Sequence, residues 1–101
     1  VLIDAGAEYD YYAADITRTY PVRRSFSGPQ RALFDVVLEA QEAAIESIAP
    51  GVAIDDVHTA ALRVLVRGLV DHGLLATSVD ESIEKELYKP FYMHRTSHWL
   101  G

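Results

Sequence analysis

The stretch that decides the fold is Val1-Leu2-Ile3-Asp4-Ala5-Gly6-Ala7, followed after a short interval by Tyr12-Ala13-Ala14-Asp15-Ile16-Thr17-Arg18-Thr19-Tyr20. Both runs consist largely of β-branched, aromatic or small residues, and Pro21 closes the second, which is the pattern of two strands. A hairpin is the natural link, because so short a connection cannot make a parallel crossover. We therefore expect the fold to begin with an antiparallel hairpin.

The loop of this hairpin sets the register of its two strands. A loop centred on Tyr9 and Asp10 places Asp4 directly opposite Asp15. The turn lacks Asn-Gly, so we expect a loop longer than two residues. Because side chains alternate along a strand, one face of the hairpin is apolar and the other carries the acids. The apolar face holds Val1, Ile3, Ala5, Ala14 and Ile16, and the acidic face holds Leu2, Asp4, Gly6, Ala13, Asp15 and Thr17.

Two carboxylates facing each other need something to offset their repulsion, because like charges directly opposite destabilise a sheet. A shared proton, the neighbouring Arg18, or one or two divalent cations are the three candidates. The small residues Gly6 and Ala13 favour a hydrated cation, since they leave room beside the acids. The alternative is that Asp4 ends its strand and Asp15 is solvated on an open face.

Three helices follow the hairpin. The first begins after Ser27 as N-cap, with Pro29 in the first turn and Gln30 as a capping-box partner, and runs until Pro50-Gly51. The second is capped by Asp55 or Asp56 and ends before Gly73. A short polar helix over 79–87 and a further strand over 91–94 complete the order. This order is α+β, with an antiparallel hairpin, covering helices and a further strand.

The chain contains four histidines. His94 and His98 lie four apart in a segment that we expect to be a strand, which would place both on one face. Imidazole beside carboxylates suits Mn, Fe, Co or Zn. His58 and His72 sit in the helical middle of the chain, and we assign them no chemistry.

Composition excludes several classes of protein. The 101 residues contain no cysteine and carry a formal net charge of −6, with the basic residues scattered. Thiolate chemistry is therefore excluded, and nucleic acid is not an expected partner. No run has the length of a membrane span, and we expect a cytoplasmic protein. Both ends look cut through packed elements, so residues 1–101 are interpreted as part of one catalytic domain that is truncated at both ends.

A family resemblance rests on three motifs in order: Ile3-Asp4-Ala5-Gly6, Tyr12-Ala13-Ala14-Asp15-Ile16-Thr17-Arg18-Thr19 and His94-Arg95-Thr96-Ser97-His98-Trp99-Leu100-Gly101. The whole chain resembles the aminopeptidase P branch of the pita-bread (creatinase/aminopeptidase-like) metallopeptidases. The resemblance implies an aminopeptidase that removes a residue preceding proline from the N-terminus of a peptide. It also implies two divalent ions, usually Mn²⁺, with a water activated between them. In the full-length protein we expect a homo-oligomer.

The same resemblance assigns roles to four residues. Asp4 would bind one ion through both carboxylate oxygens, Asp15 would bridge two ions, and His98 would bind the other ion. His94 matches a catalytic histidine near the substrate carbonyl. Two glutamates that complete the site in the family would lie beyond Gly101, so the 101 residues alone are expected to be inactive. Arg95 stands where many relatives have glycine, so this loop departs from the family pattern.

Three other readings stay open at this point. The protein could be a prolidase-like dipeptidase that acts on Xaa-Pro dipeptides. It could also be a pita-bread module that binds without catalysis, although such a module would be expected to lose an Asp or the His. The third alternative is a small acidic interaction domain without metal, which leaves the pairing of Asp4 with Asp15 unexplained.

Overall fold

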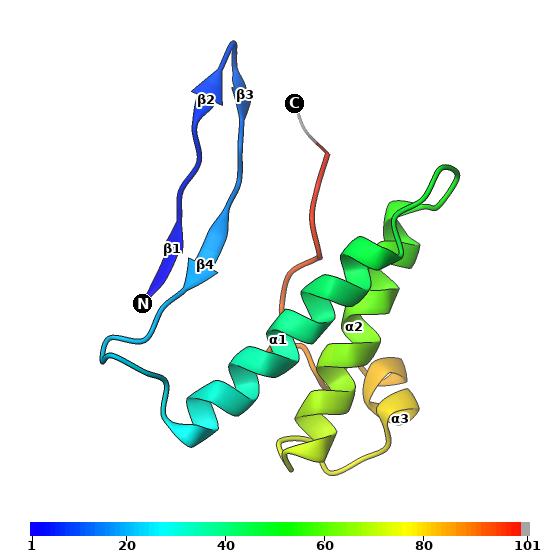
Figure 1. Ribbon diagram of the computed structural model, residues 1–101. Coiled ribbons are helices and arrows are strands. Elements are labelled where there is room, and N and C mark those ends of the chain that lie inside the picture. The colour runs from blue at the N-terminus through cyan, green and yellow to red at the C-terminus, as the bar shows by residue number, and fades with distance from the viewer. Residues whose placement is uncertain (100–101) are drawn as a thin grey trace.

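The computed structural model describes residues 1–99 and begins with the predicted hairpin (Figure 1). Its strands are β1 (Leu2–Asp4), β2 (Glu8–Tyr9), β3 (Tyr12–Ala13) and β4 (Thr17–Thr19). β1 pairs with β4 and β2 with β3, both antiparallel, so the hairpin is made of two short ladders. The predicted antiparallel start of the fold is confirmed.

The register differs from the predicted one by two residues. Asp4 pairs with Thr17, and Tyr9 pairs with Tyr12, so the predicted pairing of Asp4 with Asp15 is wrong. The turn consists of Asp10 and Tyr11 alone, at φ values of 49° and 67°. Positive φ at both positions marks the mirror-image turn whose twist matches that of paired strands. A loop longer than two residues was therefore also a wrong expectation.

A shift of two residues leaves every side chain on its predicted face, because side chains alternate with a period of two. Between the ladders the Ala5 N–H donates to the Ile16 carbonyl oxygen (3.0 Å) and the Ala14 N–H to the Ala7 carbonyl oxygen (2.9 Å). These bonds place Gly6 opposite Asp15. A Cβ atom at Gly6 would lie 1.7 Å from the carbonyl oxygen of Ala14, so only glycine fits here.

The helices are α1 (Gly28–Glu46), α2 (Ile54–Asp71) and α3 (Val79–Glu84). The predicted start of α1 is confirmed: Ser27 is the N-cap, and its N–H donates to Gln30 Oε1 (3.0 Å). The helix ends at Glu46, before Pro50, where the Ser47 hydroxyl donates to the Ala44 carbonyl oxygen (2.7 Å).

Two helix boundaries correct the sequence analysis. The N-cap of α2 is Ala53, where Asp55 or Asp56 was predicted; the Asp56 carboxylate accepts a bond from the Ala53 N–H (3.3 Å). An acid at the third helical position thus satisfies the N–H of the N-cap residue, and its charge is favourable at the N-terminus of a helix. α3 stops at Glu84 instead of Leu87, and residues 85–91 form turns.

The core lies between α1 and α2 and is built from small and aliphatic side chains. Its buried members are Ala40, Ala44, Ala61, Leu62, Val66 and Leu69. Small residues let the two helix axes approach, and an exposed ion pair between Arg67 and Glu39 (2.6 Å) bridges them. None of the helices in the described part of the chain is long and apolar enough to cross a membrane.

The C-terminal segment 92–99 runs between the hairpin and the helices (Figure 1). The strand that was predicted over 91–94 does not form among the described residues. A strand needs a neighbouring backbone to pair with, and here the segment is held by side chains of α2 instead.

Candidate metal centre

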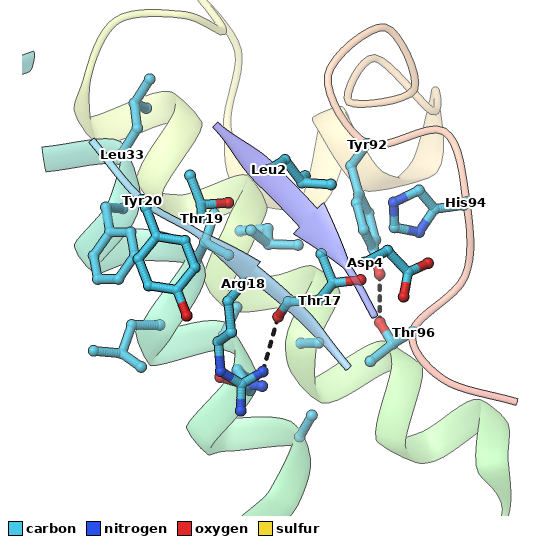
Figure 2. A pocket seen from close by; sticks show the side chains of 18 of the residues that line it. Leu2, Asp4, Thr17, Arg18, Thr19, Tyr20, Leu33, Tyr92, His94 and Thr96 are labelled. Atoms are coloured by element: carbon cyan, nitrogen blue, oxygen red, sulfur yellow. Dashed lines mark hydrogen bonds between the residues drawn. The ribbon is translucent and has the colours of Figure 1, made fainter. Parts of the chain in front are cut away.

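Asp4 and Asp15 project from one face of the hairpin into an open cavity of about 1990 Å³. The hairpin, α1, α2 and the segment 91–98 line this cavity. Figure 2 shows Asp4 on β1 at the side of the cavity where Tyr92 and His94 lie. The acids are diagonal neighbours across the hairpin, since Asp15 lies opposite Gly6 and Asp4 opposite Thr17.

His98 reaches Asp15 across 83 positions of sequence. Its Nε2 atom lies 2.9 Å from Asp15 Oδ2, and its Nδ1 atom lies 2.8 Å from the carbonyl oxygen of Trp99. A carbonyl can only accept, so Nδ1 carries a proton and donates to Trp99. That bond fixes the ring so that Nε2 faces the acids. Histidines that bind metal are oriented in this way, with one ring nitrogen donating to a carbonyl and the other binding the ion.

The pKa values of the pair move in opposite directions. The hydrogen bond from His98 lowers the pKa of Asp15, and the Asp4 side chain lowers it further. The hydrogen bond to Asp15 raises the pKa of His98, and the bond to the Trp99 carbonyl adds to this. A proton on Nε2 thus lies between the imidazole of His98 and the carboxylate of Asp15.

Arg18 does not neutralise the acids. It pairs with Ile3 in the ladder, so its side chain starts from the face opposite to Asp4. Its guanidinium donates to the carbonyl oxygen of Thr17 (2.8 Å). Arg18, one of the three candidates for offsetting the repulsion between the acids, therefore does not act as their countercharge.

His94 lines the same cavity but makes different contacts. Its ring meets Tyr92 edge-on, with centroids 4.8 Å apart, and its Nδ1 donates to the Arg95 carbonyl oxygen (2.9 Å). Both histidines line the cavity, although the strand that was expected to place them on one face does not form among the described residues.

The donor set fits part of a metal site. Two carboxylates and an imidazole nitrogen suit Mn, Fe, Co or Zn. Within residues 1–99, however, no three acidic or histidine side chains gather closely enough to hold an ion by themselves. Asp4, Asp15 and His98 would therefore need further ligands to complete a centre.

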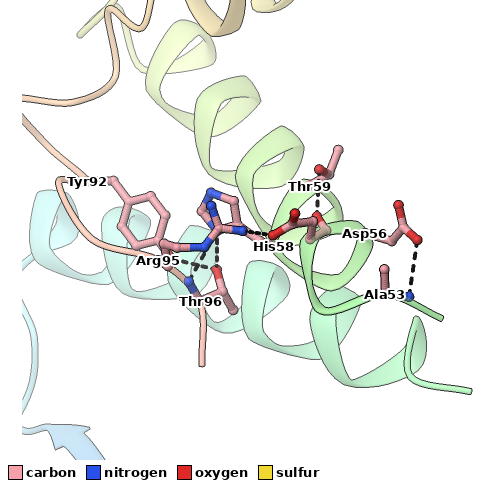
Figure 3. A network of polar contacts seen from close by, with 8 residues as sticks. Ala53, Asp56, His58, Thr59, Tyr92, Arg95 and Thr96 are labelled. Carbon is pink, nitrogen blue, oxygen red and sulfur yellow. Dashed lines mark hydrogen bonds and ion pairs between the residues drawn. The ribbon is translucent and has the colours of Figure 1, made fainter. Parts of the chain in front are cut away.

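His58, a residue without an assigned chemistry on sequence grounds, contacts the segment that carries both cavity histidines (Figure 3). Its Nδ1 accepts from the Thr96 N–H (3.2 Å), and its ring stacks on Tyr92 with centroids 6.0 Å apart. Burial lowers the pKa of His58, and the charge of Arg95 lowers it further. The spacing of Asp55 and His58, three apart on one helix face, was the signal that could have revealed this polar face.

Comparison with known proteins gives a consistent answer over the whole length. The model of metallopeptidase family M24 matches residues 1–101. The chain is 50% identical to the Xaa-Pro aminopeptidase of Haemophilus influenzae and 48% identical to that of Escherichia coli K12, over all 101 residues in both cases. It spans 24% and 23% of those two proteins, about a quarter of their length.

Solved structures agree with the sequence relatives. Aminopeptidase PepP of Pseudomonas aeruginosa superimposes with a TM-score of 0.94 at 55% identity, over 99% of this chain and 23% of that one. A zinc-substituted Escherichia coli aminopeptidase P in complex with product gives 0.92 at 48% identity, over the same shares of the two chains. These matches confirm the predicted α+β, pita-bread type of fold. The chain belongs to metallopeptidase family M24.

Proposed function

We propose that the full-length protein is a metal-dependent aminopeptidase that removes the N-terminal residue from peptides with proline in the second position. Residues 1–101 would be part of its catalytic domain. Two divalent ions, with Mn²⁺ as the physiological metal, would occupy the centre. The similarity to Xaa-Pro aminopeptidases over the whole chain supports the substrate class.

The observation that carries this proposal is the contact between His98 Nε2 and Asp15 Oδ2 at 2.9 Å. It joins an imidazole nitrogen, held by its carbonyl partner, to a carboxylate whose pKa is lowered. Both side chains remain open to solvent, with exposed fractions of 65% for His98 and 49% for Asp15. An ion could therefore enter and replace the proton between them.

The proposed ligands are Asp4, Asp15 and His98, with Asp15 as the bridging carboxylate. Asp15 suits a bridge because it lies between the imidazole of His98 and the side chain of Asp4, both of which act on its pKa. Further ligands would come from chain outside these 101 residues. Two bound ions would supply a water of lowered pKa and would polarise the scissile carbonyl.

We assign His94 the role of a catalytic hydrogen-bond partner for the substrate carbonyl. Its Nδ1–H donates to the Arg95 carbonyl oxygen, so Nε2 is the atom that can face a substrate, and it donates to a carbonyl oxygen only when it also carries a proton. The edge contact with Tyr92 fixes the plane of the ring. His94 would thus orient the substrate without binding an ion.

Metal binding tests the ligand assignment. Asp15→Asn in the full-length protein should bind Mn²⁺ at least about 100-fold more weakly in calorimetry, since loss of mere outer partners of ligands already costs about 10–100-fold. The matched control is Asp10→Asn at the hairpin turn, where φ is 49° and asparagine is well tolerated. The control should bind Mn²⁺ like the wild type. Equal affinity of Asp15→Asn and wild type would refute a bridging role for Asp15.

Peptide cleavage tests the activity. Full-length protein with Mn²⁺ should release the first residue from an Xaa-Pro-Xaa peptide and leave the matching Xaa-Ala-Xaa peptide intact. Cleavage of an Xaa-Pro dipeptide alone would instead identify a dipeptidase. No release from any of these peptides by metal-loaded protein would contradict the proposal and leave a binding module.

A further inference from the structure

The segment 92–98 carries His94 and His98, yet it contains neither helix nor strand. Backbone hydrogen bonds within a regular element therefore do not fix its path. Ser97, directly before His98, adopts a φ of 66°, a conformation that non-glycine residues hold only when surrounding contacts impose it. The contacts that impose it have to come from neighbouring elements.

The first turns of α2 supply these contacts. His58 Nδ1 accepts from the Thr96 N–H (3.2 Å) and lies 3.1 Å from Thr96 Oγ1. The Thr96 hydroxyl also meets the hydroxyl of Tyr92 (2.5 Å), whose ring stacks on His58. One residue away, the Arg95 guanidinium pairs with the Asp55 carboxylate. Figure 3 shows this network between α2 and the segment.

The network includes a hydrogen bond to the backbone of the segment as well as contacts with its side chains. The Thr96 N–H has no partner in a helix or ladder, and His58 satisfies it only through an unprotonated Nδ1. Thr96 is two residues from His98, and Arg95 is next to His94. Movement of Thr96 away from His58 would therefore shift both histidines relative to the hairpin.

We propose that His58, assisted by Asp55, is a positioning residue on α2 that holds segment 92–98 so that His98 Nε2 meets Asp15. His58 touches neither acid and acts through Thr96. The inference rests on the proposed function where it concerns metal binding, because His98 is a ligand only in that proposal. The placement of the segment itself is independent of any activity.

The test compares four variants of the full-length protein. His58→Leu removes the acceptor, whereas His58→Asn keeps an oxygen near the position of Nδ1 and should restore most of the effect. His72→Leu, at the exposed end of the same helix, is the matched control. Thr96→Val, which removes only the hydroxyl that joins Tyr92 to His58, is a milder disruption that keeps the test usable if His58→Leu does not fold.

Hydrogen exchange of the metal-free protein provides the first measurement. Amides of segment 92–98 should exchange at least about tenfold faster in His58→Leu than in wild type, because local opening loses its opposing contact. Amides of α1 should be unchanged. Equal exchange of the segment in His58→Leu, His72→Leu and wild type would overturn the positioning role.

Calorimetry with Mn²⁺ provides the second. We expect the Kd of His58→Leu to rise about tenfold, with His58→Asn closer to wild type, as for outer partners of metal ligands. Faster exchange without a change in Kd, where wild type binds Mn²⁺, would reduce His58 to a structural contact and overturn the proposal. If wild type binds no Mn²⁺, the proposed function fails, while exchange still decides whether His58 holds the segment.

Discussion

At the scale of single residues, one proton joins the side chains of His98 and Asp15. His98 donates to both Asp15 and the Trp99 carbonyl, which requires the imidazolium form. The hydrogen bond between His98 and Asp15 is the main cause of both the raised pKa of His98 and the lowered pKa of Asp15. Loss of the proton leaves Nε2 with a lone pair that already points at the carboxylate.

His58 predicts a pH dependence of stability. Its folded pKa lies below the ordinary 6.5 because burial disfavours the cation; nearby Arg95 and His94 lower it further, and Asp55 opposes them. Between these two pKa values the unfolded chain binds more protons than the folded one. His58 therefore stabilises the fold above pH 6.5, and this contribution is lost as the pH falls through 6.5 towards the folded pKa.

The measurement is thermal unfolding of the full-length protein and of His58→Asn at about pH 7.5 and about pH 5.5. The wild type should lose more in its midpoint on acidification than the variant does. All other titrating groups are common to both proteins and cancel in the comparison. Equal losses in the two proteins would show that His58 titrates alike in the folded and unfolded states.

Residue type and motif were enough to propose the two acids and His98 as metal ligands, and the structure brings His98 to Asp15. The resemblance placed Asp15 and His98 at one centre, but no spacing rule predicts the direct contact between two positions 83 apart. The role of His58 was not predicted, because its position within a helical pattern suggested packing. Its partner Thr96 lies in a segment without periodicity, so the sequence did not indicate the contact.

At the scale of elements, the hairpin shows what turn chemistry alone decides. Alternation of side chains placed the acids on one face, and that result survives a shift of two residues. The register depended on the turn, in which Asp10 and Tyr11 adopt positive φ. Such turns usually contain a glycine, and this one has none. The Glu8 carboxylate accepts from the Tyr11 N–H (2.7 Å), a compensation that sequence rules do not include.

The contact between α1 and α2 predicts a strict size limit at Gly68. A Cβ atom there would lie 2.3 Å and 2.7 Å from the two methyl groups of Val36. Alanine normally favours a helix over glycine by about 1 kcal/mol, but overpacking costs about 1–3 kcal/mol. We expect Gly68→Ala to lower the free energy of unfolding by about 1 kcal/mol in denaturant titrations of the full-length protein.

Two companion variants make this measurement specific. Adding Val36→Ala to Gly68→Ala should recover part of the loss, because the methyl groups that clash are gone. Gly28→Ala, where a Cβ would meet nothing within 4 Å, is the control and should not destabilise the protein. A stabilising effect of Gly68→Ala would mean that the helices separate at little cost.

At the scale of the whole molecule, the chain is more open than its length requires. Its radius of gyration is 15.2 Å, against about 13 Å for a compact domain of this size. The apolar face of the hairpin has no cover among residues 1–99, since Ile3 and Ile16 stay 47% and 49% exposed. Among residues 1–99 the buried apolar core is confined to the pair of helices α1 and α2.

This openness leads to a prediction about the 101 residues in isolation. With a core confined to α1 and α2 and with apolar surface exposed along the hairpin, the isolated chain should unfold at a low concentration of urea and bind an apolar dye in the absence of denaturant. Its three proposed ligands are too few to hold two ions, so it should cleave no Xaa-Pro-Xaa peptide in the presence of Mn²⁺. The full-length protein, measured alongside, should bind little dye and cleave the peptide. Cleavage by the isolated chain would show that residues 1–101 already contain a complete centre, although no three acidic or histidine side chains within residues 1–99 gather closely enough to hold an ion.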